Sequence, residues 1–130
     1  MRHMICGSVL GMVILLAPHA NVDNEFPSPD DNGSLQTSWI RHQFIATNDV
    51  NGHNFITKHL MNNFNYHLAH HLFPNVSSLY ADQLTEIIKN FAQENHFPYK
   101  SYSLIKAFQL HYQLIKRNAI DAQSFFEETM

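Results

Sequence analysis

Three histidines lie within five residues of one another in the segment NYHLAHHLFP, residues 65–74. On a helix, residues three and four apart share a face, so His67 is a neighbour of both His70 and His71. The imidazoles of His70 and His71 diverge by about 100°, because a helix has ~3.6 residues per turn. The three rings therefore form a fork, which suits two metal ions side by side better than one.

The chemistry open to this fork follows from its side-chain type. Imidazole binds Zn, Cu, Fe and Ni, and the chain has ten histidines against eight lysines and arginines together. The H-x2-H-H spacing differs from the zinc-finger H-x3-5-H, from the metalloprotease H-E-x-x-H and from the Glu-x-x-His pairs of carboxylate di-iron proteins. Two interpretations stay open: an incomplete metal site, or solvated histidines clustered by chance.

Composition narrows the class of protein. The chain has 130 residues, enough for one small domain, and its formal charge of -3 gives no basic field for nucleic acid. The one cysteine, Cys6, excludes a disulfide within the chain and a zinc site made of thiolates.

Apolar residues at spacings of three and four predict two clear helices after the histidine segment. These run from Ser78 to about Glu94 and from Ser101 to about Arg117. Both carry an apolar stripe, and the two helices are expected to pack on each other as a cap. No segment has a convincing strand pattern, so the predicted class is all-α.

The region before the histidine segment is less regular. Residues 21–34 are rich in Pro, Asn and Gly and predict a loop, with Ser34 capping a helix through residues 35–49. A short helix from about His53 to Met61 is expected next, and Pro74 ends the histidine segment.

The N-terminus allows three interpretations. Residues 4–17, MICGSVLGMVILLA, form an uncharged apolar run of 14 residues. As a helix it would span ~21 Å, short of the ~30 Å hydrocarbon core. Arg2 before it and APHA after it also resemble a secretory signal cleaved after Ala20. The run is a signal peptide, a buried helix or the end of a membrane helix.

The histidine segment resembles the third histidine box of the membrane fatty acid desaturases, in particular the front-end, linoleoyl-CoA-desaturase-like branch. The box is matched by Asn65, Tyr66, His70, His71, Leu72, Phe73 and Pro74. Further matches precede it at Trp39, His42, Gln43, Thr47 and Asp49, and follow it at Tyr80, Pro98, Tyr99, His111 and Tyr112. Several separated motifs in the right order make the resemblance specific.

The resemblance implies an oxidoreductase of lipid metabolism that introduces a cis double bond into an acyl chain carried on CoA or lipid. The family's enzymes are integral membrane proteins with a di-iron centre held almost entirely by histidines. They use molecular oxygen and two electrons from a b-type cytochrome or ferredoxin. The metal supplies the difficult C–H cleavage, while the protein fixes its geometry.

The same resemblance implies the site residues. His70 and His71 are expected iron ligands, and no catalytic residue is implied beyond the metal ligands. His67 stands where the front-end branch usually has Gln and other branches have His. His19, eight residues before Pro27, matches the place of the family's additional histidine.

Other residues are expected to line this site or orient its ligands. These residues are His42, Asn65 and Asp49. A ligating histidine normally donates its other N–H to an acceptor such as a carboxylate, and Asp49 and Asp82 are the possible acceptors here. Asn62 and Asn63 stand where the family commonly has two glycines, so we expect tight packing near the metals to be lost.

The family's first two boxes, H-x3-H and H-x2-H-H, have no counterpart in residues 1–65. The chain is therefore expected to be the C-terminal portion of a desaturase, and to be inactive alone. The expected organisation is one domain, part of a larger fold: a remnant of the last transmembrane helix (1–20), a loop and helices with the box on the cytosolic side (21–74), and a cytosolic helical region (75–130). The alternative is a small secreted or peripheral His-rich helical protein that binds metal without enzymatic activity.

Overall fold

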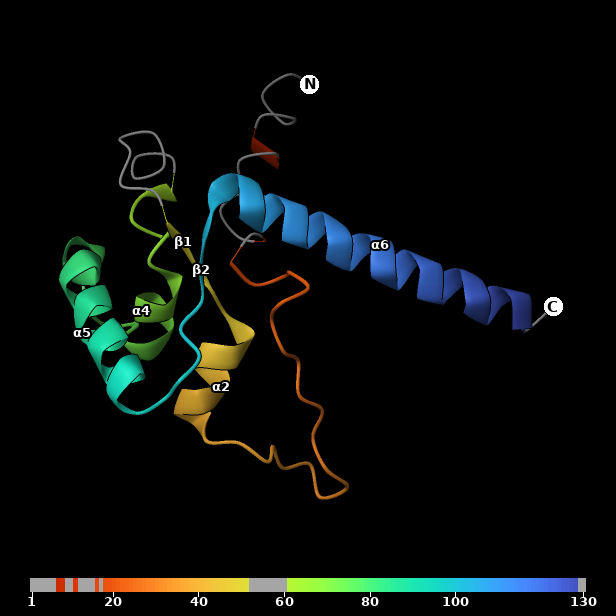
Figure 1. Ribbon diagram of the computed structural model, residues 1–130, viewed down its shortest axis with the longest axis horizontal. Coiled ribbons are helices and arrows are strands. Elements are labelled where there is room, and N and C mark those ends of the chain that lie inside the picture. Colours follow the sequence, from red (N-terminus) through yellow and green to blue (C-terminus); the bar gives the residue numbers. More distant parts are fainter. Residues whose placement is uncertain (1–6, 9–10, 12–15, 17, 52–60, 129–130) are drawn as a thin grey trace.

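The computed structural model describes residues 7–8, 11, 16, 18–51 and 61–128. Helices dominate this part of the chain (Figure 1). They are α2 (Trp39–Ala46), α4 (His67–Leu72), α5 (Ala81–Glu94) and α6 (Leu104–Glu128), with a 3-10 turn η1 (Ser78–Tyr80). Two short strands, β1 (Asp49–Asn51) and β2 (Ser101–Ser103), complete the described elements.

The predicted all-α class is right for most of these residues but missed a small sheet. β1 and β2 pair in parallel, with Asp49 opposite Ser101 and Asn51 opposite Ser103. Three-residue strands are too short to show the alternation by which a strand is recognised in a sequence. Their pairing joins the middle of the chain to the start of α6.

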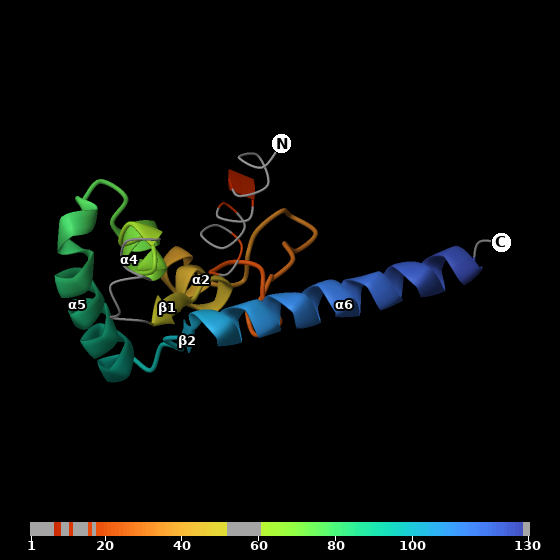
Figure 2. The ribbon, with the colours of Figure 1, turned by 90° about the horizontal axis from the view of Figure 1, so that it is seen from above.

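The helix predicted from Ser78 to Glu94 is confirmed, as η1 followed by α5. Its buried face differs from the apolar stripe that the spacing predicts (Tyr80, Leu84, Ile87, Ile88 and Phe91), because Tyr80, Ile87 and Phe91 are exposed. The buried residues are Ala81, Thr85, Ile88 and Ala92. Three of these side chains are small, which allows α5 to approach α4 closely (Figure 2).

The last helix is longer than predicted, and it packs against the two strands where packing against α5 was predicted. α6 begins at Leu104, because residues 101–103 form β2, and it continues to Glu128. Ala107 and Leu110 are buried near its start, whereas Ile105 and Tyr112 are exposed. α6 packs against β1 and β2 and then extends away from the body, with α5 at the opposite end (Figures 1 and 2). The expected packing of these two helices on each other is therefore wrong.

α2 begins four residues later than predicted. Its N-cap is Ser38, whose Oγ accepts a hydrogen bond from the backbone N–H of Arg41. The residues before it are held in a turn by Asp30, whose Oδ1 accepts from the backbone N–H groups of Asn32 and Ser34. Ser34 therefore closes a loop where a helix cap was predicted, because a carboxylate competes well for nearby backbone donors.

Two apolar clusters fix the position of α4. Phe44, Leu68, Ala69, Ile88 and Ala92 form one cluster between α2, α4 and α5. Val50, Met61 and Ala107 form the other, between β1 and α6. The histidine helix is thus packed on one side by helices and joined at its start to the sheet.

Two predicted features fall mainly outside the described residues. The short helix from His53 to Met61 is described only at Met61, and the apolar run at 4–17 only at Gly7, Ser8, Gly11 and Leu16. Among the helices that are described, none is both long enough and apolar enough to cross a membrane.

Asn62 and Asn63 have a backbone role. Their φ angles are +47° and +61°, in the left-handed region. Glycine adopts this region freely, and Asn tolerates it better than most residues. At these two positions the turn before the histidine helix needs a left-handed backbone. Asparagine can adopt that conformation, so the turn is kept although the glycines of the family are absent.

We expect Asn63→Ala to lower the free energy of unfolding by about 1 kcal/mol, because alanine pays the left-handed penalty without the local hydrogen bonds of Asn. Asn63→Gly should change it little. The measurement is thermal unfolding followed by circular dichroism. Asn90, exposed inside α5, is the matched control, and its change to Ala should be neutral or slightly stabilising. Equal losses from Asn63→Ala and Asn90→Ala would contradict the assignment.

Candidate metal centre

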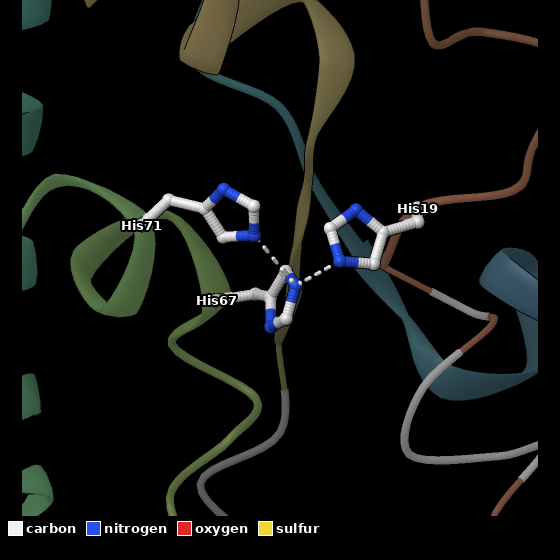
Figure 3. A group of neighbouring side chains, drawn as sticks. All are labelled: His19, His67 and His71. Carbon is white, nitrogen blue, oxygen red and sulfur yellow. Dashed lines mark hydrogen bonds between the residues drawn. The ribbon is translucent and has the colours of Figure 1, made fainter. Parts of the chain in front are cut away.

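Three histidines from two distant parts of the chain meet at one point (Figure 3). His67 and His71 lie one turn apart on α4, and their Nε2 atoms are 3.1 Å apart. Nε2 of His19 lies 2.6 Å from the same nitrogen of His67. One ligand atom from each residue falls within 4.8 Å of the others. We call His19, His67 and His71 the histidine triad.

His19 is held by a cage of buried asparagines. Nδ2 of Asn24 donates to the backbone carbonyls of Pro18 and His19, at 3.1 and 2.8 Å. The backbone N–H of Asn48 donates to the Pro18 carbonyl at 3.1 Å, and the side chain of Asn21 bonds to that of Asn48. Because all three asparagines are at most 5% exposed, this network is shielded from competing water.

The start of α6 fixes the other side of His19. Nδ1 of His111 donates to the backbone carbonyl of Ala20 at 2.5 Å, and the Val22 N–H donates to the Leu110 carbonyl at 3.3 Å. The sequence resemblance matched His111 without giving it a role. The structure places it beside the backbone of a triad member, 91 residues away in sequence from Ala20.

Gln43 orients the ring of His71. Its Oε1 lies 2.8 Å from Nδ1 of His71. Because a carbonyl oxygen can only accept, Nδ1 carries the proton and Nε2 presents a lone pair to the triad. This is the usual way in which a second residue orients a ligating histidine. The sequence offered Gln43 as a family match, next to His42, but the contact depends on how α2 packs against α4.

Asp49 and Asn65, expected to line the site or orient its ligands, hold backbone instead. Oδ1 of Asp49 accepts from the backbone N–H of Leu68 at 2.8 Å, in the first turn of α4, and Oδ2 accepts from the Tyr99 hydroxyl at 2.6 Å. Nδ2 of Asn65 donates to the Val50 carbonyl at 3.4 Å. Both side chains thus join the start of the histidine helix to its surroundings.

The other two candidates lie outside the triad. His42 is on α2, and its buried Nδ1 has no hydrogen-bond partner among the described residues. Asp82 accepts from the Tyr66 hydroxyl at 3.0 Å, at the surface. Neither side chain bonds to a triad ring within the described part of the chain.

His70 is separated from the triad although it adjoins His71. Its side chain is exposed, and its ring centroid lies 6.1 Å from that of His67 and 6.2 Å from that of His71. It packs on Phe64 at 4.8 Å and lines a pocket of about 280 Å³ with that ring. Of the four expected ligands, the structure brings three together and leaves His70 on another side of α4.

Electrostatics keeps the triad rings neutral at pH 7. Burial, followed by the charges of His19 and His71, lowers the pKa of His67 to about 3. Burial and the charges of His19 and His70 lower the pKa of His71 to about 4, and burial lowers the pKa of His19. In the neutral rings the Nε2–H of His67 can donate to the lone pair of His19 or His71, and a metal ion would take the place of that proton.

A divalent metal ion suits this donor set. Metal–nitrogen bonds of ~2.0–2.1 Å in tetrahedral geometry place two nitrogens about 3.3 Å apart. The observed separations of 2.6 and 3.1 Å from Nε2 of His67 are slightly shorter, so a small outward movement of the rings would admit one ion. The triad can offer three ligands to one metal ion, fewer than a full coordination shell.

Comparisons with known proteins bear on this site. A family model described as fatty acid desaturase matches residues 1–103, which include the whole triad. An acyl-lipid (8-3)-desaturase of Mortierella alpina is 35% identical over 64% of this chain and 19% of its own length. An sn-1 linoleoyl-lipid 6-desaturase of Synechocystis sp. is 32% identical over 81% of this chain and 29% of its length. No solved structure matches the chain.

A third relative, an acyl-lipid (8-3)-desaturase of Physcomitrium patens, is 26% identical over 88% of this chain and 24% of its own length. The chain thus spans under a third of each of these relatives. The match of the family model over most of the chain confirms the resemblance noted in its sequence. The chain belongs to the fatty acid desaturase family.

Proposed function

We propose that the chain contributes a three-histidine part of a di-iron centre in an iron- and oxygen-dependent acyl desaturase. The convergence of the three Nε2 atoms, in a chain of this family, supports the proposal most strongly. Iron would supply the oxidising power that breaks an unactivated C–H bond, with molecular oxygen as co-substrate.

The residues of this chain would bind and orient that metal. His19, His67 and His71 would bind one iron through Nε2, with Gln43 holding the Nδ1 proton of His71. His111 and the asparagine cage would keep the backbone of His19 in place. Asp49 and Asn65 would keep the start of α4 fixed, so that His67 and His71 stay aligned.

His70 would serve a second iron. It diverges from His71 as the spacing predicts, and its exposed ring is accessible to ligands from other parts of a desaturase. A di-iron centre needs more ligands than the described residues bring together. We therefore expect the isolated chain to lack desaturase activity, and we assign it to the third-box region of a larger desaturase fold.

The remaining assignments follow from the family. The substrate would be an acyl chain carried on lipid or CoA, and two of the relatives are named acyl-lipid desaturases. Electrons would come from a b-type cytochrome or ferredoxin. The histidine box would face the cytosol, at the surface of a membrane that the larger protein spans.

Adjacent histidines give a test of the triad. We expect His71→Ala to weaken binding of one Co²⁺ or Fe²⁺ ion at least about tenfold, because it removes a ligand from the group. His70→Ala, the matched control on the same helix, should change the affinity little in the isolated chain. Isothermal titration calorimetry under anaerobic conditions measures both. Equal losses from the two variants would contradict the proposed ligand set.

A second prediction concerns pH. The pKa of His67 is lowered on folding, so below pH ~6.5 the unfolded chain binds more protons than the folded one. The free energy of unfolding of the metal-free protein should therefore fall as the pH drops from about 7 to 5. His67→Gln, which places the front-end residue at this position, should make that dependence shallower. Thermal unfolding at several pH values in the presence of a chelator measures it, and parallel curves for the two proteins would contradict the prediction.

A chimera tests the enzymatic proposal. This chain would replace the matching region in the linoleoyl-lipid 6-desaturase relative, and fatty acid products would be measured by gas chromatography. We expect the chimera to form an unsaturated product, and we expect none from His71→Ala in the chimera or from the isolated chain. Metal binding by the chain together with an inactive chimera would favour the non-enzymatic metal-binding alternative. Product formation by the isolated chain would contradict the proposal that it needs a larger fold.

A further inference from the structure

A small cavity lies beside the buried residue Asp49. Its volume is about 30 Å³, and it lies between α5 and the paired strands. Asp49, Asn65, Thr85, Lys89, Tyr99 and Ser101 are among the residues that line it. Every one of these side chains ends in a nitrogen or oxygen, so this cavity can hold something that forms hydrogen bonds.

Two residues that line this cavity each have a buried polar atom without a partner. Oγ1 of Thr85 and Oδ1 of Asn65 are buried and form no hydrogen bond with the described residues. Their residues are 2% and 3% exposed, so bulk solvent does not satisfy them either. A buried polar atom without a partner costs about 1–3 kcal/mol, and native structures rarely leave two in one place.

The unpaired atoms match the hydrogen-bonding capacity of water. The Thr85 hydroxyl can donate, and the Asn65 oxygen can accept. Asp49 accepts from Leu68 and Tyr99, and its two oxygens still have capacity for another donor. A water molecule would accept from Thr85 and donate to Asn65 and Asp49, which gives the three bonds typical of a buried water.

The size and charge of the cavity exclude other occupants. A space of about 30 Å³ holds one or two water molecules but no organic ligand. Lys89 lines the same cavity, and its ammonium acts electrostatically on Asp49. A positive charge beside the cavity repels a cation, so a neutral molecule fits better than a metal ion.

We propose that this cavity is a binding site for an ordered water molecule that links Thr85 of α5 and Asn65 to the Asp49–Tyr99 pair. The water joins the packing helix α5 to the carboxylate that holds the first turn of α4. It lies outside the histidine triad and does not depend on a metal being bound there.

The direction in which one substitution changes Tm tests this site. Thr85→Val keeps the shape and the β-branching of the side chain and removes only the hydroxyl. Because it takes a partner from the water, we expect Tm to fall by about 3–6 °C. If the hydroxyl were simply unpaired, Thr85→Val would remove a buried orphan and Tm would rise, which would overturn the proposal.

Nuclear magnetic resonance gives an independent measurement on the unchanged protein. Magnetisation transfer from water to the methyl group of Thr85, with the sign of a long-lived contact, is expected in the wild type. Thr85→Ser keeps the hydroxyl but has no methyl group, so in that variant the transfer from water is measured at the side-chain amide of Asn65 and should persist. In Thr85→Val we expect the transfer to disappear. A wild-type protein without this transfer would overturn the proposal even if Thr85→Val failed to fold.

Discussion

The buried carboxylate of Asp49 connects the parts of the chain on which the histidine triad depends. It lies in β1, accepts a hydrogen bond from the first turn of α4, and accepts another from Tyr99, two residues before β2. A negative charge is favourable at a helix N-terminus, because the unpaired N–H groups there carry partial positive charge. Burial nevertheless raises the pKa of Asp49. The carboxylate is thus held at a cost in solvation, which its hydrogen bonds offset only in part.

The neutral rings of the triad depend on a backbone that is held in place by hydrogen bonds. The triad rings have low pKa values because they are buried close together, and that same closeness makes them suitable as metal ligands. Such an arrangement needs rigid support, because the three rings must stay close together when no metal ion links them. The asparagine cage, Gln43 and His111 supply that support through hydrogen bonds to backbone and to one ring.

Local features of the fold could be predicted from the sequence, and features set by tertiary contacts could not. The helix at 78–94 has a strong periodic pattern, and Pro74 marks the end of the histidine segment, so both were found. The β1–β2 pair has three residues per strand and no pattern of its own. α2 was placed too early because Ser34 and Ser38 are both plausible caps, and only the turn around Asp30 decides between them.

In the candidate metal centre too, local features could be predicted from the sequence and features set by tertiary contacts could not. Helical spacing places His67 beside both His70 and His71, and it cannot say which pair a distant ligand will join. The position of the His19 loop makes that choice, and His19 itself was found through the family resemblance alone. Gln43 was missed as an orienting residue because its role depends on the angle between α2 and α4. Contacts between elements leave no periodic trace in a sequence.

The parallel pairing of β1 with β2 has a consequence for the order in which contacts form while the protein is being synthesised. Asp49 lies opposite Ser101, and His111 reaches back 91 residues to Ala20, so both contacts close long loops. Long loops close late, because their entropy must be lost before any contact is gained. During synthesis from the N-terminus, all three triad histidines are made before Tyr99, which bonds to Asp49, and before His111, which bonds to Ala20. The contacts that Tyr99 and His111 make are therefore added after the ligands, the asparagine cage and Gln43 are already present in the chain.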